Sequence, residues 1–351
     1  MDSDKNRLRI FVLICALCLI GSVGYVWMRT GQIGNGAATG HKALAGATVS
    51  SGEVESAPRK KEVTGKAIES GGVWPKAPFI LFRTTVLDER YGQLVALPVG
   101  DLAESRTATG LACERAYFAA GQGVCLTAER GAITTYHAYL FDGSLRPGHR
   151  LPLQGIPSRA RVSPDGRYAA ITVFTSGHSY SPGTFSTRAE IYRTADGSSV
   201  AELEQFTVER DGKTFRDIDF NFWGITFAAD GNRFYATLAT GGQNYLVEGD
   251  VMARHIRIIH AGVECPSLSP DGRRIAFKRL TKSGWHLYVV DLIKKVEIPL
   301  TEKRSVDDQV EWLDDSHILY AFGDDVWVVP ADGGGSPTVF LAKAYSPVVV
   351  R

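Results

Sequence analysis

Residues 266–277 read "PSLSPDGRRIAF" and residues 161–171 read "RVSPDGRYAAI", so Ser-Pro-Asp-Gly occurs twice between apolar runs. In such a turn, Pro restricts φ at the first corner, Asp accepts hydrogen bonds from the backbone that follows it, and Gly adopts a conformation that a side chain disfavours. Flanking apolar runs indicate that the turn joins two antiparallel strands. Each copy therefore predicts a β-hairpin in which Asp and Gly have structural roles.

Weaker copies of the same pattern extend it along the chain. They are "YFAAGQGVCLTA" (117–128), "FAADGNRFYATL" (227–238) and "WLDDSHILYAF" (312–322). The turns fall near residues 121, 165, 230, 271 and 315, at intervals of 41 to 44 residues except for one interval of 65. A repeat of this length is typical of a four-stranded propeller blade. The long interval predicts an insertion within residues 175–220.

The two ends of the chain predict how the ring closes. The final stretch, "AYSPVVVR" (344–351), aligns with "ECPSLSP" (264–270) and reads as the first strand of a blade. Two further strands, "PFILFRTT" (78–85) and "YGQLVALPVGD" (91–101), lie at the other end of the propeller region. Because a propeller closes its ring to avoid exposed strand edges, both ends are expected to share one blade. The predicted fold is all-β, a six-bladed β-propeller of four-stranded blades over residues 76–351.

The repeat resembles that of the TolB-like (WD-repeat-like) β-propellers, in which a Ser-Pro-Asp-Gly hairpin precedes an apolar strand and Tyr-Val-x-Asp. The resemblance covers residues 77–351 and is carried by "ECPSLSPDGRRIAF…HLYVVDL" (264–292) and "RVSPDGRYAAITVF…AEIYRTADG" (161–197). It implies the propeller alone, because the separate N-terminal α/β domain of TolB has no clear counterpart here. Docking to the peptidoglycan-associated lipoprotein is therefore not implied for this chain.

An uncharged stretch, "IFVLICALCLIGSVGYVWM" (10–28), is about long enough to cross a hydrocarbon core of roughly 30 Å. Lys5, Arg7 and Arg9 precede it, which predicts that residues 1–9 are cytoplasmic and that the rest of the chain is outside. The alternative is a cleaved signal peptide. Residues 29–75 are rich in Gly, Ala, Ser and Thr and are expected to form a flexible linker. The predicted protein is single-pass in the cell membrane, with an extracytoplasmic propeller, periplasmic or extracellular.

Composition and motifs exclude several functions. A formal net charge of +1 offers no basic excess for nucleic-acid binding. There is no G-x-S-x-G or H-E-x-x-H motif, so no catalytic residue, cofactor or metal site is predicted. Cys113 and Cys125 lie on two arms of one predicted hairpin, about three residues out of register, which leaves open whether they form a disulfide.

One set of equivalent positions is the candidate binding site. Aligned hairpins place Glu114, Ser158, Trp223, Glu264, Asp308 and Tyr345 where each innermost strand begins. That place lies near one mouth of the central channel, and Asp307 and Glu311 add acidity beside Asp308. Such a mouth would bind a cation, a basic peptide or a sugar. The alternative is that these positions are exposed and polar only for solubility.

A second candidate is the loop "TSGHSYSPGTFSTR" (175–188), with His178, Tyr180 and Phe185 as binding residues. The function expected from these features is a membrane-tethered, non-enzymatic scaffold that docks a protein or an envelope polymer. A propeller-type lyase or glycosidase that uses the channel-mouth carboxylates is the alternative. A third alternative is a sensor that signals through the short cytoplasmic tail.

Overall fold

The computed structural model describes residues 69–70, 74–102, 106–175 and 186–351. The predicted cytoplasmic tail, the segment 10–28 and the loop residues His178, Tyr180 and Phe185 lie outside this part of the chain. Within it, no helix is long and apolar enough to span a bilayer. The described residues form strands and one short 3₁₀ helix, η1 (Leu203–Gln205).

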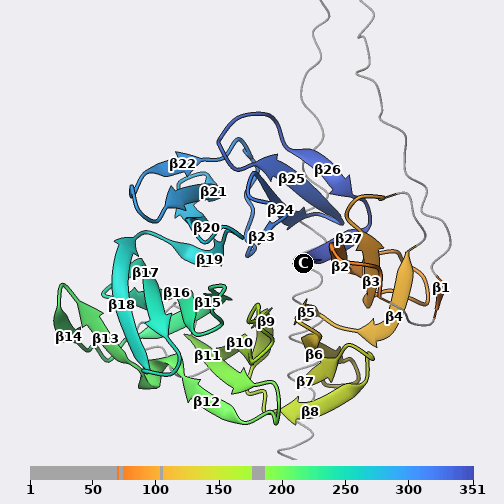
Figure 1. The fold of residues 1–351 in the computed structure, drawn as a ribbon, viewed down its shortest axis with the longest axis horizontal. Coiled ribbons are helices and arrows are strands. Elements are labelled where there is room, and N and C mark those ends of the chain that lie inside the picture. The colour runs from red at the N-terminus through yellow and green to blue at the C-terminus, as the bar shows by residue number, and fades with distance from the viewer. Residues whose placement is uncertain (1–68, 71–73, 103–105, 176–185) are drawn as a thin grey trace, which may run out of the picture. The chain divides into compact units, whose positions relative to one another are not determined.

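Six sheets surround a central axis as propeller blades (Figure 1). Blade 1 contains β27 (Ala344–Val350), β2 (Phe79–Thr84), β3 (Gln93–Pro98), β4 (Thr107–Ala112) and β1 (Glu69–Ser70). Blade 2 contains β5 (Arg115–Ala119), β6 (Gln122–Glu129), β7 (Thr135–Asp142) and β8 (Pro147–Leu151). Blade 3 contains β9 (Ile156–Val162), β10 (Tyr168–Thr175), β11 (Ser186–Arg193) and β12 (Ser199–Glu202).

The other three blades follow in chain order. Blade 4 contains β15 (Asn221–Phe227), β16 (Arg233–Thr240), β17 (Gln243–Asp250) and β18 (His255–Ala261), extended by β13 (Thr207–Arg210) and β14 (Lys213–Phe215). Blade 5 contains β19 (Glu264–Leu268), β20 (Arg274–Thr281), β21 (Gly284–Asp291) and β22 (Glu297–Pro299). Blade 6 contains β23 (Glu311–Trp312), β24 (His317–Phe322), β25 (Asp325–Pro330) and β26 (Thr338–Leu341). The predicted six-bladed, all-β propeller is confirmed.

The ring closes as the sequence predicts. The C-terminal strand β27 is the innermost strand of blade 1 and pairs antiparallel with β2, with Phe79 opposite Val350 and Ile80 opposite Val349. The apolar side chains of this pair are buried, so closure also removes apolar surface from water. Both ends of the propeller region therefore build one blade, and the innermost strand of that blade comes from the end of the chain.

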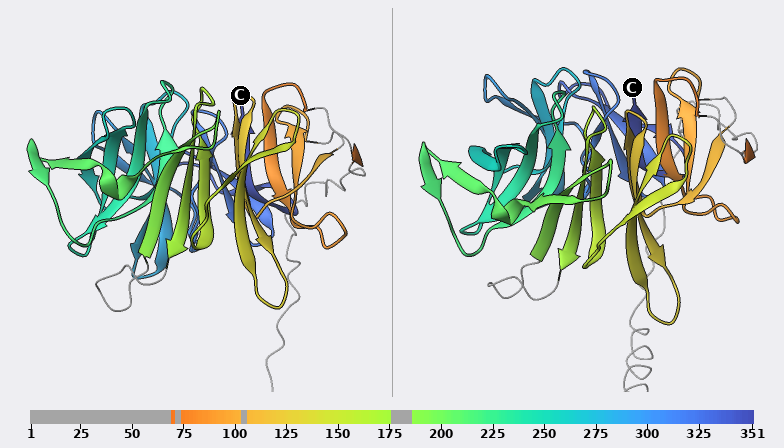
Figure 2. Two further views of the ribbon diagram at one scale, coloured as in Figure 1. Left: turned by 90° about the horizontal axis from the view of Figure 1, so that it is seen from below. Right: turned by 60° about the horizontal axis from the view of Figure 1, so that its bottom comes forward.

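The long interval in the repeat holds β12, η1 and the β13–β14 hairpin. Strand β13 pairs in parallel with β18, so blade 4 has six strands rather than the four expected. Figure 2 shows this hairpin projecting from the side of the ring. Blade 1 is also wider than expected, because β1, which falls in the predicted linker, pairs with the outer edge of β4. The four-strand rule holds for the other four blades.

The Ser-Pro-Asp-Gly turns are structural, as expected. Asp165 Oδ1 accepts hydrogen bonds from Ser163 Oγ at 2.6 Å and from the Arg167 amide at 3.1 Å, while Gly166 has a φ of +73°. The same turn joins the next blade, because Arg167 Nη2 donates to the Asp230 carbonyl at 2.9 Å. Side chains from adjacent blades also pack together, as Ile191 of blade 3 does with Phe222 and Phe234 of blade 4. Each turn thus shapes its own hairpin, and the turn of blade 3 also links that blade to blade 4.

Cys113 and Cys125 form a disulfide with a Cα–Cα distance of 5.6 Å. Cys125 lies opposite Ala116 in the β5–β6 pair, so the out-of-register relation expected from the sequence is present. Cys113 comes before β5, and its amide donates to Gly92 of blade 1 rather than to β6. The bend between Cys113 and β5 brings the two sulfurs together, and the disulfide joins the β4–β5 connection to blade 2.

Candidate functional site

The ring has two faces, which are named here by what they carry. The turn face carries the hairpin turns between the first and second strands of the blades, near residues 120, 165, 230, 271 and 315. The start face is where the innermost strands begin, at or next to the aligned positions Glu114, Ser158, Trp223, Glu264, Asp308 and Tyr345. These residues lie around one end of the channel, and four of them, Ser158, Trp223, Glu264 and Asp308, are buried rather than exposed.

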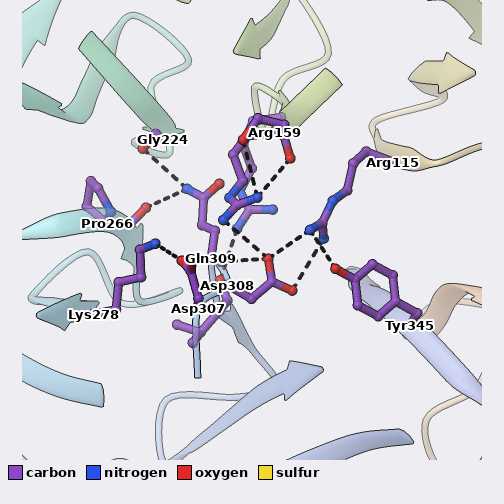
Figure 3. Close-up of polar contacts among 12 residues, drawn as sticks. Arg115, Arg159, Gly224, Pro266, Lys278, Asp307, Asp308, Gln309 and Tyr345 are labelled. Carbon is purple, nitrogen blue, oxygen red and sulfur yellow. Dashed lines mark hydrogen bonds and ion pairs between the residues drawn. The ribbon is translucent and has the colours of Figure 1, made fainter. Parts of the chain in front are cut away.

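Asp308 lies at the centre of an ion-pair network across the channel (Figure 3). Its carboxylate accepts from Arg115 of β5, at 3.1 Å for Oδ1 and 3.3 Å for Oδ2, and lies 3.6 Å from Arg159 of β9. Burial would raise the pKa of Asp308, but the two guanidinium groups hold it below its ordinary value. Asp308 is therefore ionised and neutralised by two cations of this same chain.

Tyr345 and Gln309 extend this network to other blades. Arg115 Nη2 donates to the Tyr345 hydroxyl at 2.8 Å, and its guanidinium lies 4.7 Å from the centre of that ring. Gln309 Nε2 donates to the carbonyl of Pro266 at 2.7 Å and to that of Gly224 at 3.3 Å (Figure 3). Strands or segments of all six blades thus meet in one layer of polar side chains and backbone groups, which we call the charged layer: Arg115, Arg159, Asp308, Gln309 and Tyr345.

Asp307 and Glu264 lie beside the charged layer. Asp307 forms an ion pair with Lys278, which is buried and also lies 4.0 Å from the centre of the Trp285 ring. Glu264 is opposite Lys278 in the β19–β20 pair. Burial raises the pKa of Glu264, and the ammonium of Lys278 opposes that shift. Glu264 is thus the one predicted site carboxyl for which a raised pKa is resolved.

Glu114 lies apart from the Asp308 network. Its carboxylate is 2.8 Å from Arg130 and 3.7 Å from Arg83. Trp223 is buried at the start face, where it is opposite Thr237 in the β15–β16 pair. Gly224, which follows it with a φ of +68°, leaves no room for a side chain, because a Cβ would lie 2.8 Å from the Cys265 Cα. These positions serve blade packing as well as the channel.

Glu311, three residues after Asp308, lies further along the channel toward the turn face. Its carboxylate is 3.4 Å from Arg161 and accepts from the Tyr117 hydroxyl at 3.3 Å, while Arg161 lies 4.7 Å from the centre of the Tyr117 ring. Burial raises the pKa of Tyr117, and the charge of Glu311 adds to the shift. This phenol therefore stays protonated and donates its hydrogen bond over the whole physiological range.

Beyond Glu311, the channel opens at the turn face into a cavity of about 210 Å³. We call it the channel cavity. Its lining combines aromatic, charged and hydroxyl side chains, among them Tyr117, Arg161, Thr226, Ser267, Glu311, Trp312 and Arg351. Arg351 Nη2 also donates to Leu313 at 3.3 Å, which holds the C-terminal residue at the cavity. The charged layer lies on the start-face side of this cavity.

Sequence reasoning missed the cations that pair with the predicted carboxylates. Arg115 and Arg159 directly follow the aligned positions Glu114 and Ser158, and Arg161 comes two residues later. Alternate residues of a strand face the same side, so every second residue of each innermost strand lines the channel. The arginines are at these positions. The aligned sequence carries this signal at the residue that follows Glu114 and at the residue that follows Ser158. Among the described residues, no group of three or more His, Cys, Asp or Glu is arranged to hold a metal ion.

Comparisons with known proteins establish the fold alone. No model of a protein family matches this sequence, and no curated protein matches it. The structure is similar to TolB from Acinetobacter baumannii, with 17% identity over 78% of this chain and 67% of that chain and a TM-score of 0.57. It is also similar to a chain of a nidogen/laminin complex, with 11% identity over 78% of this chain and 97% of that chain and a TM-score of 0.51. A puromycin-hydrolyzing peptidase of Mycobacterium tuberculosis matches at 15% identity over 76% of this chain and 44% of that chain, with a TM-score of 0.47. This protein is therefore a TolB-like six-bladed propeller in fold.

Proposed function

We propose that this TolB-like propeller is a non-enzymatic binding scaffold, tethered to a membrane, that docks a protein partner at the channel cavity of its turn face. The observation that carries the proposal is the cavity itself, which combines Tyr117 and Trp312 with the charged groups of Arg161 and Glu311. Aromatic and arginine side chains at a concave site are the residues that contribute most to protein–protein binding. Mixed lining of this kind suits an inserted side chain or chain end of a partner.

The charged layer supports a binding function rather than a catalytic one at this end of the channel. Asp308 has two guanidinium neighbours and a lowered pKa, so it holds no proton to donate near neutral pH. A sugar or metal ion would have to displace arginines that already satisfy the carboxylate. The same pairs lie on the start-face side of the cavity, and we take the turn face as the side from which a partner approaches.

Cross-linking from the cavity rim tests the docking proposal. A photoreactive residue at exposed Pro270, in the full chain in native membranes, is expected to give a discrete cross-linked product. Substituting exposed Ala229 at the rim, Ala229→Trp, fills the opening and is expected to remove that product. Ala253→Trp is the matched control, because Ala253 is also exposed but does not line the cavity. A product that is equally abundant in both variants would overturn the proposal.

The tether is proposed from the uncharged stretch 10–28 and the basic residues before it. The Cys113–Cys125 disulfide supports an oxidising, extracytoplasmic location for the propeller. We expect the full chain to stay with membranes at alkaline pH and the propeller to be digested once the outer barrier is opened. A propeller that resists protease under those conditions, and is digested only after the inner membrane is lysed, contradicts this orientation.

A second candidate function, a lyase or glycosidase, is favoured by one observation at Glu264. A buried carboxyl whose pKa is raised beside a lysine has the property of a general acid. Turnover of an envelope polysaccharide that is lost in Glu264→Gln and kept in Glu114→Gln would favour this enzyme over the scaffold. Equal behaviour of the two variants would exclude Glu264 as its acid.

A further inference from the structure

A second concave site lies on the turn face, between blades 2 and 3. It is a groove of about 730 Å³, which we call the blade 2–3 groove. The β7–β8 turn and β8 form one side, and the turns β9–β10 and β11–β12 form the other. Its volume is within the range of ligand-binding clefts, roughly 300–1,000 Å³. The cavity proposed above as the docking site is a separate hollow, and the groove needs its own explanation.

The groove has an excess of positive charge. The exposed side chains of Arg146 and Arg193 reach it from opposite sides, and neither guanidinium lies within ion-pair distance of a carboxylate in the described residues. Arg193 has one weak neutral partner, with Nη1 donating to Ser198 Oγ at 3.3 Å. Most other arginines of the described chain are paired with carboxylates or carbonyl groups. Neither guanidinium is held in a direct ion pair, although each acts at longer range on one carboxylate, Arg146 on Asp142 and Arg193 on Asp196.

The acidic residues of the groove are already occupied. Asp142 accepts from the amide of Ser144 at 2.8 Å and from its hydroxyl at 2.5 Å, which closes the β7–β8 turn. Asp165 is held by the Ser163 hydroxyl and forms an ion pair with Arg167. Both carboxylates serve their own turns, and neither forms a direct ion pair with Arg146 or Arg193, although the charge of Arg146 contributes to the lowered pKa of Asp142. The lining carries three guanidinium groups, those of Arg146, Arg167 and Arg193, against the two carboxylates of Asp142 and Asp165, so its net charge is positive.

The walls of the groove favour a peptide as its occupant. Strand β8 is the outermost strand of blade 2 and pairs only with β7 among the described strands. An outer strand keeps backbone N–H and C=O groups with which an extended chain can pair. Leu140, Phe141 and Tyr168 add apolar surface to the lining. Carboxylates on an extended segment would meet guanidinium groups with the planar geometry that arginine recognises.

We propose that the blade 2–3 groove binds an acidic peptide segment of a partner protein, with Arg146 and Arg193 as its carboxylate-binding residues. The site goes beyond the docking function of the channel cavity and is independent of it. A partner that docks on the turn face would use the groove as a second point of attachment, which adds affinity through linkage.

The test measures binding of labelled peptides to the full chain in detergent by fluorescence anisotropy. The probe is a fluorescein-labelled peptide of about ten alternating Glu and Ser residues, long enough when extended to run along the groove. We expect it to bind about tenfold or more tightly than the same peptide with Gln in place of Glu. We also expect the affinity to fall as salt is raised, because the contacts are ionic and exposed.

Substitutions separate the groove from general surface charge. The variant Arg146→Gln/Arg193→Gln is expected to weaken binding of the Glu/Ser peptide about tenfold. Arg216→Gln/Arg273→Gln is the matched control, because both side chains are exposed, form no ion pair within the described part of the chain and lie outside the groove. Ala229→Trp at the channel cavity is expected to leave binding of the Glu/Ser peptide unchanged, because Ala229 does not line the groove. Failure of the groove proposal can therefore be distinguished from failure of the docking proposal.

Three results would overturn the proposal. One is an equal loss of affinity in the control pair, which would mean that the peptide senses only overall charge. Another is equal binding of the Gln peptide. The third is displacement of the Glu/Ser peptide by dextran sulfate at lower concentration than by unlabelled peptide, which would assign the groove to an anionic polysaccharide instead.

Discussion

Arg115 of blade 2 and Asp308 of blade 6 form an ion pair across the channel, 193 residues apart in sequence and 3.1 Å apart between Nη2 and Oδ1. Both side chains are largely shielded from solvent, at 15% and 6% exposure. Asp308 also lies 3.6 Å from Arg159 of blade 3. A single carboxylate therefore holds two cations from neighbouring blades at the centre of the ring.

Removing that carboxylate is expected to destabilise the propeller strongly. Asp308→Ala leaves the guanidinium groups of Arg115 and Arg159 close together without a counter-charge, and such uncompensated burial costs about 3–5 kcal/mol. Urea unfolding followed by tryptophan fluorescence measures the change. Asp324→Ala is the control, because the Asp324–Lys343 pair is exposed on both sides and is worth less than about 1 kcal/mol. Similar losses for the two variants would contradict the role given to Asp308.

Gly231 is expected to tolerate no side chain, for two reasons. Its φ is +69°, and a Cβ there would overlap the carboxylate of Asp165 in the neighbouring blade. Gly212 has a similar φ of +75° but has no atom within 4 Å of its Cβ position. Gly212→Ala is expected to lower the free energy of unfolding by about 1 kcal/mol, from the backbone conformation alone. Gly231→Ala should lower the free energy of unfolding clearly more than Gly212→Ala does. Equal thermal unfolding temperatures for the two variants would contradict a steric conflict between a side chain at position 231 and Asp165.

Glu204 makes stability depend on pH. Its carboxyl oxygens are shielded from solvent, and burial raises the pKa of Glu204 to about 7, from an ordinary 4.5. A carboxyl whose pKa is raised in the folded state binds its proton more tightly there, so its contribution favours folding at low pH. That contribution is lost as pH rises from about 4.5 through about 7, and amounts to about 3 kcal/mol.

The variant Glu204→Gln removes this titration. Its stability relative to the wild type is expected to rise with pH between about 5 and 8, as measured by urea unfolding at each pH. Glu89→Gln, at an exposed position, serves as the control and should run parallel to the wild type. A constant difference between Glu204→Gln and the wild type at all pH values would contradict a raised pKa.

The Cys113–Cys125 disulfide is expected to stabilise blade 2. It closes a short loop, with a sequence separation of 12, which corresponds to about 2–3 kcal/mol of unfolding free energy. The double variant Cys113→Ser/Cys125→Ser should therefore unfold at lower urea concentration than the wild type. Adding a thiol reductant should lower the wild-type midpoint and leave the double variant unchanged. A wild-type midpoint that ignores the reductant would mean that the two cysteines are not joined in the isolated protein.

The repeat made the fold predictable because each hairpin is encoded locally. Ser163, Asp165 and Gly166 form their turn with neighbours only a few residues away, and strand alternation then defines the inner and outer sides. Closure by residues 344–350 followed from the same alignment. The position of β13–β14 did not, since the parallel pairing of β13 with β18 joins segments about fifty residues apart that no single hairpin turn connects.

The sequence by itself determined that five hairpin repeats and the two ends of the propeller region build a six-bladed ring, that both ends share a blade, and that polar residues stand where the innermost strands begin. Only the tertiary structure decided what those residues do. Glu311, Asp307 and Asp308 read as a free acidic mouth in the sequence, but closure of the ring brings Arg161, Lys278 and Arg115 against them. The physical reason is that a hairpin turn is satisfied by its own neighbours, whereas a buried charge is satisfied only by groups that folding brings from distant blades.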